Sequence, residues 1–257
     1  MRILITNDDG INSPGLDALV RIAAEISDDV WIVAPEYDQS GVAHSLSLND
    51  PLRLRPIGER RFAVKGTPTD CVILGARHVL DDKAPDLLLS GVNRGHNLGE
   101  DVTYSGTVAG AIEGALLGIP AIAMSQAYPP GFREKVSYAT AEAHGASVIR
   151  KVLEAGLPAG GLVNVNFPNC APEEVEGIRA TRQGQRPQWQ AQVERRLDGR
   201  HNPYFWIVYG HEIGDPGAET DLRAVADRCI SVTPLKIDMT DASMLDRLSG
   251  AFARHEG

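Results

Sequence analysis

The chain has 257 residues, of which 43% are hydrophobic and 23% are charged, and these ordinary values exclude a disordered or fibrous protein. Lysine and arginine total 25 against 34 aspartate and glutamate residues, so the formal net charge is −9 and the summed field repels polyanions. Nucleic acid is therefore excluded as an expected partner, because binding a phosphate backbone requires a cationic surface.

The first residues, MRILITNDDG, lack the long apolar region and the small-residue cleavage site of a signal peptide. No apolar stretch approaches the ~18–20 residues of a membrane span. Cys71, Cys170 and Cys229 are far apart and have no zinc-site or disulfide-framework spacing, which indicates reduced thiols. We therefore expect a cytoplasmic protein that has no membrane partner.

The first 35 residues predict a βαβ unit. A β-branched apolar run at 2–6 predicts a buried strand, which polar Asn7-Asp8-Asp9-Gly10 ends. Apolar residues with helical spacing follow over 16–26, and a second buried strand is expected at 30–34. Continuous apolar runs of this kind are typical of a parallel sheet that helices cover on both faces.

The same alternation of helix and strand continues to residue 167. We expect helices over 68–80, 106–117 and 135–156, strands over 86–92, 120–125 and 161–167, and a hairpin or edge insertion within 45–64. The fold class is therefore α/β, with a Rossmann-like, doubly wound and mostly parallel sheet in a catalytic core of residues 1–170.

The composition changes after residue 170. The segment 183–200 is polar and charged, and the strand-like run 204–209 stands alone. Such a strand needs a partner in this chain or another, because an unpaired apolar edge aggregates. A strand over 229–235 and a helix over 241–254 complete the pattern. We interpret 171–257 as a β-rich extension that packs back on the core and serves oligomerisation.

Ligands in open parallel sheets bind beyond the carboxyl ends of the strands, which here selects the loops 7–14, 35–44 and 91–104. In the first loop, Asp8 and Asp9 either repel each other and raise a pKa, or share a cation. Hard oxygen ligands favour Mg²⁺ or Mn²⁺ over zinc. A solvated turn is the alternative, because Asn-Asp-Asp-Gly is ordinary turn chemistry.

The third loop and the helix after it offer a site for an anion. The loop holds two asparagines, Arg94 and His96 between glycines, so an amide oxygen can ligate a metal and a cationic side chain can meet an anion. An irregular loop with capping asparagines is the alternative. Ser105-Gly106-Thr107 opens the next helix, and its free backbone N–H groups can bind phosphate. The alternative there is a simple serine N-cap.

Other patterns are explained by structure or are missing. Gly106, Gly110 and Gly114 permit close helix packing, and helix capping accounts for Thr67 and Asp70. The chain lacks a P-loop lysine, a G-x-G-x-x-G turn after the first strand and a G-x-S-x-G elbow. These absences argue against three common enzyme classes.

Five ordered motifs carry a resemblance to a known family. RILITNDDGINSPG, VAPEYDQSG, GTPTDCV, SGVNRGHNLGEDVTYSGTVAGAIEG and ISVTPL closely resemble the SurE family of survival proteins, which are metal-dependent 5'-nucleotidases. The match is colinear from residue 1 to about 125 and returns more weakly at NPYFWI and near the C-terminus. Residues 181–201, rich in glutamine and arginine, depart more from the family pattern.

The resemblance implies a set of site residues. The residues that match the family's ligands for one divalent cation are Asp8, Asp9, Ser40 and Asn93. Those that match its phosphate pocket are Asn97, Ser105, Gly106 and Thr107. Thr67 and Asp70 match a motif that borders the site.

The function implied is a phosphomonoesterase that uses one Mg²⁺ or Mn²⁺ per subunit and hydrolyses nucleoside 5'-monophosphates to nucleoside and phosphate, with 3'-nucleotides and short polyphosphate as further substrates. Asp8 or Asp9 acts there as base, as nucleophile or only as ligand. The family pairs its extensions in homodimers or homotetramers. The alternatives are a nucleotide-sensing module without turnover and an enzyme of different chemistry, such as nucleotide-sugar transfer, which would need a second sugar pocket.

Overall fold

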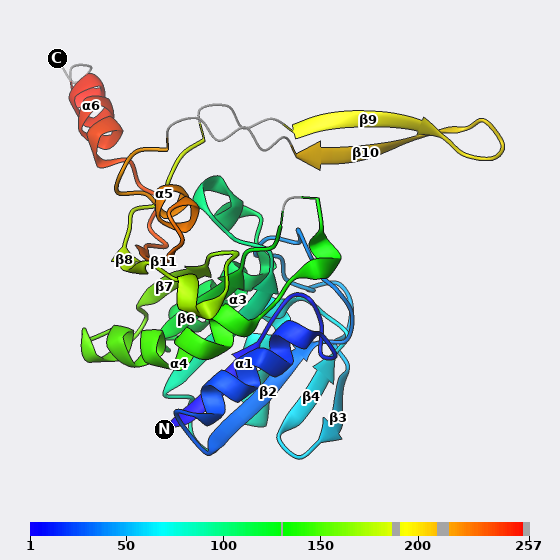
Figure 1. The fold of residues 1–257 in the computed structure, drawn as a ribbon, viewed down its shortest axis with the longest axis vertical. Helices are drawn as coiled ribbons and strands as arrows, with labels where there is room; N and C mark the ends of the chain where they lie inside the picture. The colour runs from blue at the N-terminus through cyan, green and yellow to red at the C-terminus, as the bar shows by residue number, and fades with distance from the viewer. Residues whose placement is uncertain (130, 187–190, 210–215, 254–257) are drawn as a thin grey trace.

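The computed structural model describes residues 1–129, 131–186, 191–209 and 216–253 and is built on a nine-stranded sheet (Figure 1). The strand order is β3-β4-β2-β1-β5-β6-β7-β11-β8. All neighbours from β4 through β7 run parallel, whereas β3 and β11 are antiparallel to their inner neighbours. The strands of this sheet are β1 (Arg2–Thr6), β2 (Asp29–Pro35), β3 (Leu54–Gly58), β4 (Arg61–Val64), β5 (Leu87–Arg94), β6 (Ala121–Gln126), β7 (Leu162–Phe167), β8 (Gly177–Ala180) and β11 (Cys229–Leu235).

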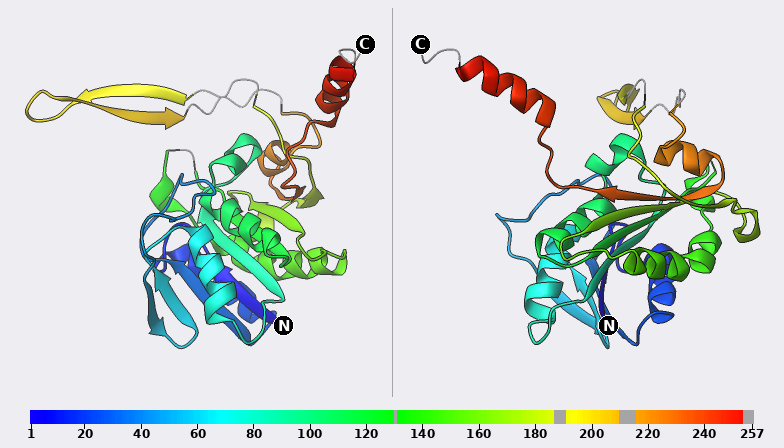
Figure 2. Two further views of the ribbon diagram at one scale, coloured as in Figure 1. Left: turned by 180° about the vertical axis from the view of Figure 1, so that it is seen from behind. Right: turned by 90° about the vertical axis from the view of Figure 1, so that its left-hand side faces the viewer.

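Helices cover both faces of the sheet, which confirms the doubly wound α/β fold (Figure 2). One face carries α1 (Pro14–Ala24) and α4 (Ala139–Glu154), and the other carries α2 (Pro68–Leu74) and α3 (Gly106–Leu116). The three middle residues of strand β1 are all apolar because their side chains pack against helices on both faces of the sheet. Ile3 and Ile5 join the buried cluster under α1 and α4, and Leu4 joins the cluster under α2 and α3.

The loop from β1 to α1 is fixed by its own polar side chains. Asn7 Nδ2 donates to the carbonyl of Gly10 at 3.0 Å and to Ser13 Oγ at 2.7 Å. Ser13 then caps α1, because its Oγ accepts from the Leu16 backbone N–H at 3.3 Å and Pro14 occupies the first turn. The paired aspartates between Asn7 and Gly10 are thereby held at the end of β1.

Helix α3 lies unusually close to the sheet. A Cβ added at Gly110 would lie 2.9 Å from Thr6 Cγ2, and one at Gly114 would lie 2.3 Å from Leu88 Cδ2. These glycines therefore serve helix packing, as their four-residue spacing predicted. The close approach brings the N-terminus of α3 to the end of β1.

Two expected elements differ in shape from the prediction. The helix expected over 68–80 ends at Leu74, and a π-helical turn, Gly75–Val79, continues it. Within 45–64, only β3 and β4 form the predicted hairpin, which lies at the sheet edge.

The chain beyond residue 170 contributes to the main sheet and also leaves it. β8 and β11 extend the sheet, and α5 (Asp221–Ala226) precedes β11. The expected strand at 204–209 is β10 (Pro203–Tyr209), whose partner in this chain is β9 (Ala191–Leu197), a strand that the sequence did not predict. This hairpin and α6 (Ala242–Phe252) project from the body (Figures 1 and 2).

The cysteines and the helix lengths bear on two predictions made from the sequence. Cys71, Cys170 and Cys229 are all free thiols, as predicted. Among the residues that the structure describes, no helix has the length and apolar character needed to cross a membrane.

Candidate active site

The candidate site lies where β1, β5 and the loop after β2 end beside the N-terminus of α3. Asp8, Ser40, Asn93 and Asn97 line one pocket of about 300 Å³. Asp9 lines a neighbouring cavity of about 480 Å³, and Arg94 lines both. The structure thus brings residues from three separate motifs to one edge of the sheet.

Asp8 is the most buried carboxylate of the pocket, with 3% of the residue exposed. Burial raises its pKa to about 7; a hydrogen bond from Thr107 opposes this shift, and the charge of Asp9 adds to it. Thr107 Oγ1 donates to Asp8 Oδ1 at 2.5 Å. A Cβ at Gly106 would lie only 2.8 Å from Asp8 Cβ, so glycine lets the helix start meet this side chain.

Asp9 has one carboxylate oxygen satisfied and one that is not. Its Oδ2 accepts from the Arg94 backbone N–H at 2.8 Å, whereas Oδ1 is buried without a hydrogen bond and lies 3.6 Å from Arg94 Nη2. Burial raises the pKa of Asp9, and the Arg94 N–H opposes the shift. A buried oxygen without a donor is costly, and a bound cation would satisfy it.

Ser40 and Asn93 add neutral oxygens to the two carboxylates. Asn93 Nδ2 donates to the Gly95 carbonyl at 2.9 Å, which leaves its Oδ1 available as an acceptor. Ser40 Oγ accepts from Arg133 Nη2 at 3.3 Å. Among the described residues, no three His, Cys, Asp or Glu side chains gather as a metal cluster. The residues present still fit a hard cation such as Mg²⁺ or Mn²⁺, because two carboxylates, a hydroxyl and an amide are all oxygen donors.

Asn97 and the start of α3 make up the side of the site that was predicted to bind phosphate. Asn97 lines the pocket, whereas Ser105, Gly106 and Thr107 are buried and are not among its lining residues. Asn97 is 6% exposed, and its Nδ2 donates to Ser125 Oγ at 2.8 Å. Ser105 Oγ accepts from the Val108 N–H at 3.0 Å, so the predicted alternative of a serine N-cap describes its side chain correctly. The Val108 N–H is used by this cap, so the N–H groups of Gly106 and Thr107 are those that remain suited to an anion.

Several pocket residues were not identified from the sequence. Tyr104 and Asp101 from the third loop, and Tyr128 and Arg133 after β6, also line the pocket. The sheet-end rule could have found the last two, because β6 ends at the same edge as β5. Arg94 or His96 was predicted as a cationic side chain that could meet an anion; both line the pocket, and Arg94 Nη2 lies 3.3 Å from Asp38 Oδ2.

The loop that carries Ser40 is tied down by side chains outside the pocket. Asp70 accepts from both the backbone N–H and Oγ of Ser47, at 3.1 and 2.7 Å, while it also accepts from the Thr67 N–H at 2.9 Å. Capping of α2 therefore does not fully account for Asp70, contrary to the expectation from sequence. His44 Nε2 lies 3.0 Å from Glu113 Oε2 of α3 and makes a second tie.

Comparisons with known proteins agree with this geometry. A family model described as "Survival protein SurE" matches residues 3–190. Proteins named 5'-nucleotidase SurE from Methylorubrum populi and Azorhizobium caulinodans are each 62% identical over 252 residues, which is 98% of this chain and 99% of each relative. The crystal structure of the SurE protein from Aquifex aeolicus matches with a TM-score of 0.84 and 42% identity over 98% of this chain and 99% of that one.

Proposed function

The chain belongs to the SurE family, and from this membership and the pocket geometry we propose that it is a metal-dependent phosphomonoesterase that hydrolyses nucleoside 5'-monophosphates to nucleoside and phosphate. One observation carries the proposal. A donor set for a hard cation, Asp8, Ser40 and Asn93, shares a pocket with Asn97 beside a helix start suited to phosphate. An acidic protein needs such local devices to hold an anionic substrate.

Two groups of residues have separate roles in the proposed mechanism: one binds the cation and the other binds the phosphoryl group. Asp8, Asp9, Ser40 and Asn93 hold one divalent cation per subunit, Mg²⁺ or Mn²⁺. A bound cation withdraws charge from a phosphoryl oxygen and lowers the pKa of water. The residues that bind and orient the phosphoryl group are Asn97, Ser105, Gly106 and Thr107, of which Gly106 and Thr107 offer the backbone N–H groups of the helix start.

Asp8 and Asp9 are also the residues that we propose for the chemical step. As base, a carboxylate among them takes a proton of the attacking water; the water oxygen bonds to phosphorus, the P–O bond to the nucleoside breaks, and the nucleoside oxygen leaves with a proton. As nucleophile, the carboxylate displaces the nucleoside and forms an acyl phosphate, which a water then hydrolyses to phosphate. Burial raises the pKa of Asp8 to about 7 in the metal-free chain, and the charge of a bound cation would lower this pKa and favour the carboxylate. Its hydrogen bond from Thr107 fixes the carboxyl orientation for either role.

The proposal extends to substrates, location and assembly. 3'-Nucleotides and short polyphosphate are further substrates, and the protein acts in the cytoplasm. Residues 171–257 join subunits in a homodimer or homotetramer. Exposed apolar side chains support this assembly, among them Phe205 and Ile207 of β10 and Phe252 of α6, which are 59%, 66% and 69% exposed.

The experiment that tests the proposal is phosphate release from nucleoside 5'- and 3'-monophosphates by protein that is first stripped with a chelator. We expect no release without metal, release after Mg²⁺ or Mn²⁺ is restored, and loss of activity in Asp8→Asn. If Asp8→Asn still binds metal but has lost activity, this result indicates that Asp8 has a role in the chemical step. A folded, metal-loaded wild type that binds nucleotide but releases no phosphate would contradict the proposal and indicate a sensing module.

A further inference from the structure

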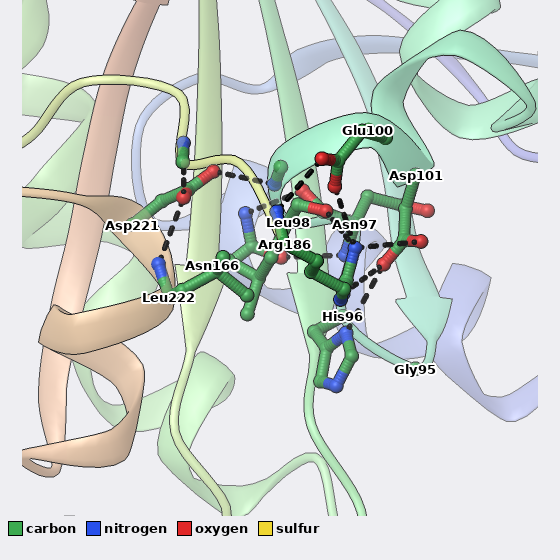
Figure 3. A network of polar contacts seen from close by, with 12 residues as sticks. Gly95, His96, Asn97, Leu98, Glu100, Asp101, Asn166, Arg186, Asp221 and Leu222 are labelled. Atoms are coloured by element: carbon green, nitrogen blue, oxygen red, sulfur yellow. Dashed lines mark hydrogen bonds and ion pairs between the residues drawn. The ribbon is translucent and has the colours of Figure 1, made fainter. Parts of the chain in front are cut away.

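The segment 97–101, which we name the Asn97 loop, is held by chain that lies far from it in sequence (Figure 3). The Asn97 N–H donates to Asn166 Oδ1 at 2.7 Å, and its carbonyl accepts from Asn164 Nδ2 at 2.8 Å. The Gly99 N–H donates to Asp221 Oδ2 at 2.9 Å. Every one of these partners lies beyond residue 160, so the loop is shaped by the second half of the chain.

Arg186 makes the densest set of contacts to this loop. Its side chain is 7% exposed, and Nη1 lies 3.2 Å from the Leu98 carbonyl and from Glu100 Oε2. Nη1 and Nη2 lie 3.2 and 2.8 Å from the two Asp101 carboxylate oxygens (Figure 3). Its backbone N–H donates to Glu100 Oε1 at 2.7 Å. A planar guanidinium can serve these acceptors together, and an ammonium group cannot.

Asp221 joins the Arg186 segment to the same loop. Its carboxylate is fully buried and accepts from the Gly99 N–H and, at 2.8 Å, from the Gly184 N–H. Gly184 precedes Arg186 by two residues. The loop and the segment around Arg186 are therefore fixed against each other by a carboxylate at the start of α5.

We call the contacts of Arg186 and Asp221 with the Asn97 loop the Arg186 clamp. These contacts continue to the start of α3. The carbonyl of Asp101 accepts from the Tyr104 N–H at 3.0 Å and from the Ser105 N–H at 3.1 Å. Asp101 thus connects Arg186 to the N-cap of the helix, while Leu98 connects Arg186 to Asn97. Arg186 is therefore connected both to Asn97 and to the N-cap of α3.

We propose that Arg186 is a positioning residue for the phosphate side of the pocket, and that the chain around Arg186 and Asp221 is part of the catalytic unit rather than only of the oligomerisation extension. This inference rests on the proposed phosphatase function. Arg186 does not line the pocket and acts through Asn97 and Ser105. A displacement of about 1 Å at such a position can cost about a hundredfold in rate.

The test compares Arg186→Gln and Arg186→Lys with Arg182→Gln. Arg182 is a matched control, because it lies in the same segment and pairs with Glu219 at 3.2 Å while both side chains are about 80% exposed. We expect kcat/KM for a nucleoside 5'-monophosphate to fall at least about tenfold in both Arg186 variants and less than about twofold in Arg182→Gln. Unchanged kcat/KM in Arg186→Gln overturns the inference.

A double-mutant cycle with Asn97→Ala separates positioning from general destabilisation. If Arg186 acts through Asn97, Arg186→Gln costs much less in the Asn97→Ala background than in wild type. Fully additive losses in folded variants, verified by urea unfolding, contradict the inference. Should Arg186→Gln not fold, the cycle is run with Arg186→Lys, which retains the charge.

Backbone amide hydrogen exchange tests the contacts between Arg186 and the Asn97 loop without a measurement of enzymatic activity. We expect the amides of Asn97 and Gly99 to exchange faster in Arg186→Gln or Arg186→Lys, while the amide of Leu88 in β5 keeps its wild-type rate. Unchanged exchange at Asn97 and Gly99 contradicts the inference whatever the activity. A wild type that releases no phosphate, with variants that exchange as expected, contradicts only the proposed function.

Discussion

Asp8 carries its charge at a cost in stability. Burial raises the pKa of its carboxyl from 3.8 to about 7, so between these values the folded chain binds a proton that the unfolded chain releases. Without a bound cation, this group therefore lowers the free energy of unfolding as the pH rises from about 4 to about 7. The same residue is the proposed ligand and base, so stability is exchanged for function at one position.

The variant Asp8→Asn tests this linkage. We expect metal-free Asp8→Asn to be more stable than metal-free wild type at pH 8, and the difference to shrink at pH 4.5. Urea unfolding in the presence of a chelator measures both values. With saturating Mg²⁺ the wild type should regain stability that the variant does not. A variant that is less stable than wild type at pH 8 without metal would contradict the argument.

Residues of the site differ in how far the sequence predicts them. Asp8 follows β1 and Asn93 lies at the carboxyl end of β5, so the sheet-end rule identifies their position from local sequence. Arg186 and Asp221 have no such signal. Arg186 lies 86 residues after its partner Glu100. The residues next to Arg186 in sequence are polar, which suggests an exposed side chain, whereas in the structure this side chain is only 7% exposed. Only tertiary packing reveals their contacts.

At the scale of elements, the strands buried on both faces were predicted, whereas of the two exposed hairpin strands β10 was predicted and β9 was not. β1 and β5 have continuous apolar runs because helices cover both sides of them. β9 reads AQVERRL and has no such run, since its extended conformation depends on pairing with β10. α5, with six residues, is too short for its periodicity to be recognised in the sequence.

The tie between α2 and the loop of Ser40 predicts an effect on metal affinity. Asp70→Asn removes acceptors for Ser47 and Thr67, so the Ser40 loop should loosen. Because groups that orient metal ligands contribute about 10–100-fold to affinity, we expect the Mn²⁺ concentration for half-maximal activity to rise about tenfold. Asp241→Asn is the control, since Asp241 also accepts a backbone hydrogen bond at the start of a helix but caps α6 as its N-cap residue, outside the pocket. Equal metal dependence in both variants would exclude a role for the tie.

At the scale of the whole molecule, one face of the β9–β10 hairpin is exposed and mostly apolar, with Arg195 as a charged residue on it. The pairing register places Val193 opposite Ile207 and Leu197 opposite Pro203, and Phe205 lies on this same face. Val193, Leu197, Phe205 and Ile207 are 67%, 48%, 59% and 66% exposed. Such a face on a hairpin that projects from the body (Figure 1) favours association with a second copy of the chain.

Sedimentation velocity tests that association. We expect the wild type to sediment with a mass of two or four times 27.6 kDa. Ile207→Lys should shift the protein toward smaller species, because a charge buried in an apolar interface is costly. Leu116→Lys, which adds the same charge at an exposed position of α3, should leave the mass unchanged. Since the pocket and the Arg186 clamp are built from a single chain, we also expect Ile207→Lys to retain most of its activity per subunit. Loss of activity in step with dissociation would mean that a neighbouring subunit completes the site.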